Sequence, residues 1–168
     1  MLNSIINAID FLIEKQGRLS SFLIYPLLII VIFEVIMRYA FNAPTSWGFE
    51  ATSFAYGLHF MLGLSYMERH SGHVRVDILA SRLSPKVQSV LGLLTYLVIF
   101  VPVYTLMTVS ACKYAYVSTV AQELNSTSWA PPIWPIKIFM ALSFFLLLVQ
   151  GLSTLLKHLR TLTGGQPT

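Results

Sequence analysis

Charged residues and cysteine are both scarce in this 168-residue sequence. Asp, Glu, Lys and Arg make up only 11% of the residues, whereas they make up about a quarter of a typical soluble domain. Hydrophobic residues make up 55% of the sequence, and the mean hydropathy is +0.69. This composition excludes an ordinary soluble domain and indicates an integral membrane protein.

The residues that catalysis or cofactor binding requires are also few. Cys112 is the single cysteine, which excludes an internal disulfide and a dithiol relay. His59 is the only histidine in a predicted span, so no second intramembrane histidine is present to hold a haem. His70 and His73 share a connection with Glu68, but these ligands are too few and too irregular to indicate a zinc site. The sequence therefore predicts neither an enzyme nor a bound cofactor or metal.

Four apolar stretches reach the roughly 20 residues that a helix needs to cross a hydrocarbon layer. They are Leu19–Phe41, Trp47–Met67, Val87–Val109 and Ile133–Leu156. We predict a single all-α membrane domain, residues 1–168, with four transmembrane helices. Pro26 and Pro102 fall inside spans and predict kinks there.

Two further segments are predicted to be amphipathic helices. In residues 1–18 apolar side chains recur at helical spacing with polar ones between them, which is typical of a helix at the membrane interface. A short helix is predicted at Val76–Leu83, in the connection between the second and third spans. Most basic residues lie in this connection and near the two termini, so we expect both termini to be cytoplasmic. The pI of 9.3 then reflects topology and contact with anionic lipid, and no nucleic-acid partner is predicted.

Glu34 and Arg38 are the charged residues at the end of the first span. They are four residues apart, so a helix places them on one face, where they can pair. A carboxylate inside a membrane is a candidate for binding a proton or a cationic drug. We favour a structural pair, because the guanidinium of Arg38 would neutralise such a site.

Trp47 and Glu50 open the second span and allow two interpretations. Glu50 is favoured by the dipole at a helix N-terminus, next to a possible cap from Thr45 or Ser46. Alternatively, Arg38, Trp47 and Glu50 form a fixed polar corner at the outer surface, which orients the hairpin and meets a partner. Both interpretations stay open at this point.

Several short motifs occur in an order and spacing that resemble a known family. The sequence is similar to the small permease (Q-type) subunit of tripartite ATP-independent periplasmic (TRAP) transporters over nearly its whole length. The residues that carry the resemblance are Arg38, Tyr39, Phe41, Asn42, Ser46, Trp47, Glu50, Gly63, Arg69, His73, Val74, Val76 and Asp77, followed by Ser126–Trp129 before a proline-rich start of the last span. The family often has two adjacent acids after the tryptophan, whereas Phe49 stands at the first of these positions here.

The resemblance implies a noncatalytic subunit in the bacterial inner membrane. It would bind a large multi-spanning permease, which carries the sodium sites and the substrate path, and a periplasmic substrate-binding protein would feed this permease. Substrates of the family are mostly organic acids such as dicarboxylates or sialic acids. The small subunit would enlarge the static scaffold against which an elevator-like transport domain moves, and would help to receive the binding protein. We expect the large permease to be a separate polypeptide in a one-to-one complex.

Candidate site residues follow from these motifs. Subunit-interface or structural roles are expected for Glu34, Arg38, Tyr39, Trp47 and Glu50, and a cytoplasmic loop motif is formed by Arg69, His73 and Asp77. Two other classes of protein remain as alternatives. One is an autonomous four-helix exporter that uses Glu34 as its proton site, and the other is a membrane anchor of a respiratory complex. The sequence does not indicate which acid would be carried.

Overall fold

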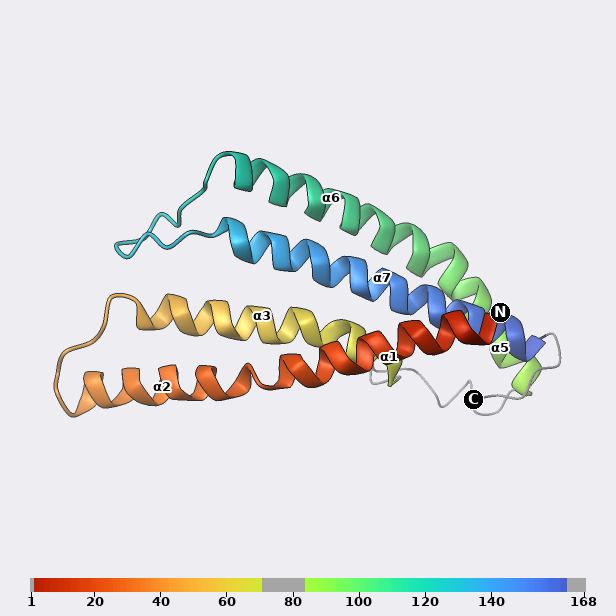
Figure 1. Cartoon of the computed structure of the whole chain (residues 1–168), viewed down its shortest axis with the longest axis horizontal. Coiled ribbons are helices and arrows are strands. Elements are labelled where there is room, and N and C mark those ends of the chain that lie inside the picture. The colour runs from red at the N-terminus through yellow and green to blue at the C-terminus, as the bar shows by residue number, and fades with distance from the viewer. Residues whose placement is uncertain (1, 71–83, 163–168) are drawn as a thin grey trace.

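The computed structural model describes residues 2–70 and 84–162, which form a bundle of long helices (Figure 1). The predicted Val76–Leu83 helix, His73 and Asp77 lie outside these ranges. Within them the structure has an isolated bridge between Leu124 and Pro132 and no strand. The helical segments are α1 (Leu2–Ser21), α2 (Ile24–Tyr39), α3 (Gly48–Arg69), α5 (Pro85–Thr95), the π-helix η1 (Tyr96–Phe100), α6 (Val101–Val120) and α7 (Trp134–Leu162). The all-α fold is therefore confirmed.

Three helical stretches in the described part are long and apolar enough to cross a membrane. They are Asn3–Tyr39, Val90–Val120 and Trp134–Arg160. Helix α3 covers the second predicted span, and its 22 residues are long enough to cross. Its polar residues, among them Glu50, His59 and Glu68, lower its hydropathy, so α3 is not one of the three.

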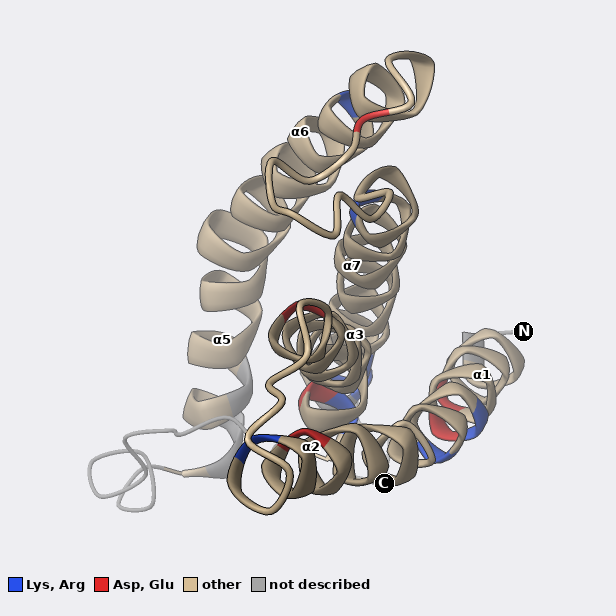
Figure 2. Cartoon of the chain, turned by 90° about the vertical axis from the view of Figure 1, so that its left-hand side faces the viewer, with Lys and Arg blue, Asp and Glu red and all other residues tan. Residues whose placement is uncertain are grey.

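Helix α7 is the centre of the bundle, with α1, α3, α5 and α6 in contact with it. Seen along the long axis, α3 lies between α2 and α7 (Figure 2). The α2–α3 connection and the α6–α7 connection lie at one end of the bundle, which we call the outer end, and the N-terminus lies at the other, inner end (Figure 1). The fold thus brings both outer connections to one end of the molecule.

Helix α1 runs on from α2 along the bundle and packs on α3 and α7. Its inward face includes Ile6 and Ile13, which are both buried, while Leu12 and Phe11 are exposed. The predicted helix in residues 1–18 is present, but it belongs to the bundle because its polar residues find partners on two other helices. Its placement at the membrane interface stays a prediction.

Both prolines predicted to kink a span lie next to an irregularity in the helix. The helix is interrupted at Phe22 and Leu23, between α1 and α2. Phe22 is four residues before Pro26. A proline ring clashes with the carbonyl four residues before it, which accounts for the interruption. The π-helix η1 ends two residues before Pro102, and a π-turn is a common way for a helix to absorb such a disruption.

Helix α6 continues past Val109, the predicted end of the third span, as far as Val120. The connection between α6 and α7 therefore covers residues 121–133, and residues 110–120 belong to the helix. Thr108 and Thr119 stay compatible with the helix because each hydroxyl donates a hydrogen bond to the carbonyl four residues before it. Helix propensity and packing on α7 thus extend the helix beyond the apolar stretch.

Candidate functional site

The carboxylate of Glu34 joins the end of α2 to the start of α3 at the outer end. Arg38 Nη2 donates a hydrogen bond to Glu34 Oε1 at 2.7 Å, so the pair that the spacing predicts is formed. The hydroxyl of Thr45 donates to the other oxygen, Oε2, and the backbone N–H of Thr45 lies 3.4 Å from it. Both oxygens of the carboxylate are therefore engaged by this chain, and Glu34 is nearly buried.

Gly48 completes this arrangement. Its backbone N–H donates to the hydroxyl of Thr45 at 3.0 Å, so Thr45 satisfies one of the first free N–H groups of α3. A Cβ atom on Gly48 would lie 2.6 Å from Thr45 Oγ1 and closer still to Glu34 Oε2. Only glycine fits here without displacing the carboxylate. Of the two capping residues that the sequence suggested, Thr45 makes the contact.

Trp47 and Glu50 contact residues of the α6–α7 connection. The Trp47 ring stacks on Phe33 with centroids 5.7 Å apart and lies 6.4 Å from the Trp129 ring. Glu50 is buried, and Asn125 Nδ2 donates to its Oε2 at 3.4 Å. These contacts link the start of α3 to residues 121–133, although the two segments are far apart in the sequence.

The predicted corner of Arg38, Trp47 and Glu50 therefore consists of two adjacent sets of contacts. Arg38 belongs to the set around Glu34, and Trp47 and Glu50 belong to the set that includes the outer connection. Among the described residues no hydrogen bond or ring contact joins Arg38 directly to Trp47 or Glu50. The functional roles of these residues stay predictions.

The α6–α7 connection, residues 121–133, is closed by contacts that could not be predicted from the sequence. Within it, the N–H of Asn125 donates to the Pro131 carbonyl at 2.9 Å. At its ends, Lys137 pairs with the Glu123 carboxylate, and its ammonium lies 3.9 Å from the centre of the Tyr114 ring. The Lys137 ammonium holds the pKa of the Glu123 carboxyl below its usual value. The loop therefore presents a fixed surface that includes the half-exposed Trp129.

A hollow with exposed rings lies beside Glu34 on the outer end. It has a volume of about 230 Å³, and its lining includes Glu34, Arg38, Tyr39 and Phe49. The Arg38 side chain is 51% exposed even though it is paired. Tyr39 and Phe49 are among the most exposed rings of the described chain, at 80% and 76%. A half-exposed guanidinium among aromatic rings is a composition enriched in protein–protein interfaces.

A second polar cluster ties α1 to α7 at the inner end. Lys157 Nζ donates to Asp10 Oδ2 at 2.7 Å. Gln150 Nε2 and Ser153 Oγ donate to Asp10 Oδ1 at 3.2 and 3.1 Å. This cluster could not be predicted from the sequence, because its members lie at opposite ends of the chain and no spacing rule relates them.

A third cluster ties α1 to α3. Glu14 accepts hydrogen bonds from Arg18 on its own helix and from Arg69 at the end of α3, and His70 Nε2 lies 3.1 Å from it. Arg69, expected as part of a cytoplasmic loop motif, thus contributes to helix packing. The sequence did not indicate this pairing.

His59 and Gln16 supply further contacts between α1 and α3. His59 Nδ1 lies 3.1 Å from the carbonyl oxygen of Ser20, so this histidine contacts the backbone of α1. Gln16 Nε2 donates to the Leu62 carbonyl at 3.0 Å. Across the described residues, no group of three or more His, Cys, Asp or Glu side chains is placed to hold a metal ion. His59 and Gln16 thus add two polar contacts between α1 and α3.

Comparison with known protein families finds a match over most of the chain. The family model described as the DctQ component of tripartite ATP-independent periplasmic transporters matches residues 27–161. The matched segment includes the Glu34 and Trp47 contact sets at the outer end and most of α7. No curated protein matches the chain.

Proposed function

Because the chain belongs to the DctQ component family of TRAP transporters, we propose that it braces the large permease of a sodium-coupled, binding-protein-dependent uptake system for organic acids. The family is a membrane component of a transporter and not an enzyme. The sodium sites and the substrate path would lie on the large permease. The small subunit would be part of the static scaffold against which an elevator-like transport domain moves.

The proposed topology has four spans in the bacterial inner membrane, with both termini in the cytoplasm. The 22-residue α3 would be the fourth span in addition to the three apolar stretches. Its position between α2 and α7 supports this, since neighbouring helices cover part of its polar surface. The basic residues near the termini support the orientation.

The occupied carboxylate of Glu34 is the observation that best supports a bracing role. A proton-coupled exporter needs a carboxylate that releases and rebinds its ligand. In this chain Arg38 and Thr45 engage both oxygens of Glu34, and the backbone of Gly48 packs close against the carboxylate. Glu34 therefore fits a fixed structural joint better than a transport site.

The outer end offers the surface on which we place partner contacts. Arg38 and the exposed rings of Tyr39 and Phe49 surround the hollow beside Glu34, and Trp129 extends the aromatic surface across the other outer connection. We propose that this surface contacts the large permease and helps to receive the periplasmic binding protein.

Replacing Arg38 with alanine tests this proposal. Loss of one polar interface contact is worth about 0.6 to 1.7 kcal/mol in a membrane, so recovery of the large permease with this subunit should fall roughly 3- to 20-fold, and uptake should fall with it. Membrane insertion should be unchanged, because Thr45 still holds Glu34. Lys113→Ala, which removes an exposed positive charge from α6, is the matched control and should have little effect. Unchanged recovery and unchanged uptake for Arg38→Ala would contradict the proposal.

A further inference from the structure

A groove of about 490 Å³ lies between the end of α1 and the inner half of α3. Its apolar lining includes Phe60, Leu64 and Met67 of α3. Its polar lining includes Arg18 and Ser21 from the last turns of α1. This groove is separate from the contact sets around Glu34 at the outer end and around Asp10 at the inner end.

Two glycines give the groove its shape. Gly17 lets α1 lie against the Tyr66 ring, since a Cβ on Gly17 would come within 2.8 Å of Tyr66 Cβ. Gly63 lines the groove on α3, and apart from the backbone of α3 itself no atom of the described chain lies within 4 Å of the place where its Cβ would be. Glycine inside a helix is destabilising, so a packed neighbour usually accounts for it. The open space over Gly63 has no such neighbour among residues 2–70 and 84–162.

The inner end of the groove has an excess of positive charge. Glu14 is the carboxylate shared by the guanidinium groups of Arg18 and Arg69. One negative charge therefore faces two positive ones, and Arg69 is the less exposed partner. The Arg18 side chain is 75% exposed, and its bond to Glu14 uses only Nε. Among the described residues, the terminal nitrogens of Arg18 have no hydrogen-bond partner, and Arg18 lines the groove.

We propose that this groove binds one anionic phospholipid. The phosphate would lie against Arg18, and an acyl chain would run along Met67 and over Gly63 to Phe60. Charge complementarity supports this occupant, because the groove combines a partly uncompensated cation at its inner end with an apolar lining toward the middle of α3. The ligand is already present in the bilayer around the protein. Lipid binding in this groove would be independent of the solute that the transporter carries.

The test of the apolar part compares two glycine substitutions. The full chain, tagged and purified with its associated subunits, is incubated with dioleoyl phosphatidylglycerol, and retained lipid is counted by native mass spectrometry. Gly63→Leu places a side chain in the groove and should lower retention roughly tenfold, as excluding about two methylene groups would do. Gly57→Leu is the matched control, because Gly57 is also open on α3 but does not line the groove, and it should retain the lipid.

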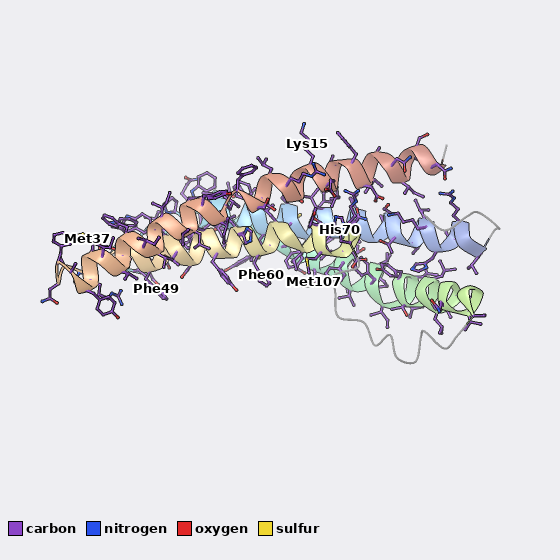
Figure 3. All side chains as sticks on the ribbon, turned by 90° about the horizontal axis from the view of Figure 1, so that it is seen from below. Lys15, Met37, Phe49, Phe60, His70 and Met107 are labelled. Atoms are coloured by element: carbon purple, nitrogen blue, oxygen red, sulfur yellow. The ribbon has the colours of Figure 1, made fainter. Side chains whose placement is uncertain are left out.

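The test of the charged part uses Arg18→Gln with Lys15→Gln as control. Lys15 lies on α1 and extends away from the bundle on the side opposite Phe60 (Figure 3). Arg18→Gln should remove the preference for dioleoyl phosphatidylglycerol over dioleoyl phosphatidylcholine, and Lys15→Gln should keep it. Equal retention by the Gly63 and Gly57 variants, or no preference for the anionic lipid in the unaltered chain, would overturn the proposal. Loss of an associated protein from Gly63→Leu with lipid retention unchanged would also overturn it, since a protein helix would then fill the groove.

Discussion

Asp10→Ala is expected to detach α1 from α7 and to destabilise the inner end of the bundle by about 2 kcal/mol or more. Asp10 accepts hydrogen bonds from Lys157, Gln150 and Ser153. Gln150 is completely buried, and its Oε1 has no hydrogen-bond partner in the described structure. Without Asp10, its Nε2 would lose its acceptor as well. An entire buried amide would then lack partners, and this is the main source of the expected cost.

This expectation is checked by the thermal unfolding of the purified chain and by the rate of proteolysis within residues 2–21. Asp10→Asn keeps a neutral acceptor for Gln150 and should have an intermediate effect. Lys15→Ala changes an exposed residue on the same helix and should be close to neutral. An Asp10→Ala chain as stable and as protease-resistant as the Lys15→Ala chain would show that α1 is not held by this cluster.

Gly48→Val is expected to disrupt the outer end more severely than any loss of a single hydrogen bond there. The added Cβ would collide with Glu34 and Thr45, and overpacking of this kind costs about 1 to 3 kcal/mol. To relieve the collision the start of α3 would have to move, which separates Thr45 from Glu34 and shifts Trp47 relative to Phe33. Recovery of the large permease and solute uptake should therefore both fall further than in Arg38→Ala.

Gly57→Val is the matched control for this substitution. It adds the same side chain to the same helix at a position where, apart from the backbone of α3, no atom of the described residues lies within 4 Å of the new Cβ. Insertion of the hairpin and recovery of the large permease should then be lower for Gly48→Val than for Gly57→Val. Equal recovery from both would mean that the close packing at Gly48 does not matter for assembly.

The sequence predicted those parts of the molecule that depend on local spacing. The pair of Glu34 and Arg38 follows from their separation by one helical turn and is present at 2.7 Å. The short connection after α2 and the capping role of Thr45 were visible for the same reason. The order of short motifs also indicated the family, and the match over residues 27–161 confirms it.

Contacts between distant segments could not be predicted in this way. Asp10 pairs with Lys157 across almost the whole chain, and Glu14 pairs with Arg69. In the sequence these residues looked like the polar face of an isolated amphipathic helix, because a periodic pattern shows that a face is polar and not what covers it. Helix α6 continues to Val120, past the predicted end of the third span at Val109, because hydropathy indicates a span and does not locate the end of a helix.

Whether helix α3 spans the membrane is also hard to predict from local sequence alone. Its length suits a span, but Glu50, His59 and Glu68 make it less apolar than the other stretches. Glu68 and Glu50 are buried, and Glu68 accepts a hydrogen bond from Tyr96. Hydropathy counts each of these side chains as if it faced lipid, whereas in the bundle both are buried against other parts of the chain. The proposed four-span topology depends on this distinction.

The most direct test of the proposed bracing role is to identify what this chain binds in its native membrane. The chain would be tagged at its C-terminus and purified gently, and every protein recovered in stoichiometric amount would be identified by mass spectrometry. The proposed function predicts a large multi-spanning permease in one-to-one ratio with the tagged chain. Recovery of a redox enzyme, or of the chain alone as an oligomer that exchanges protons for solute in liposomes, would contradict it.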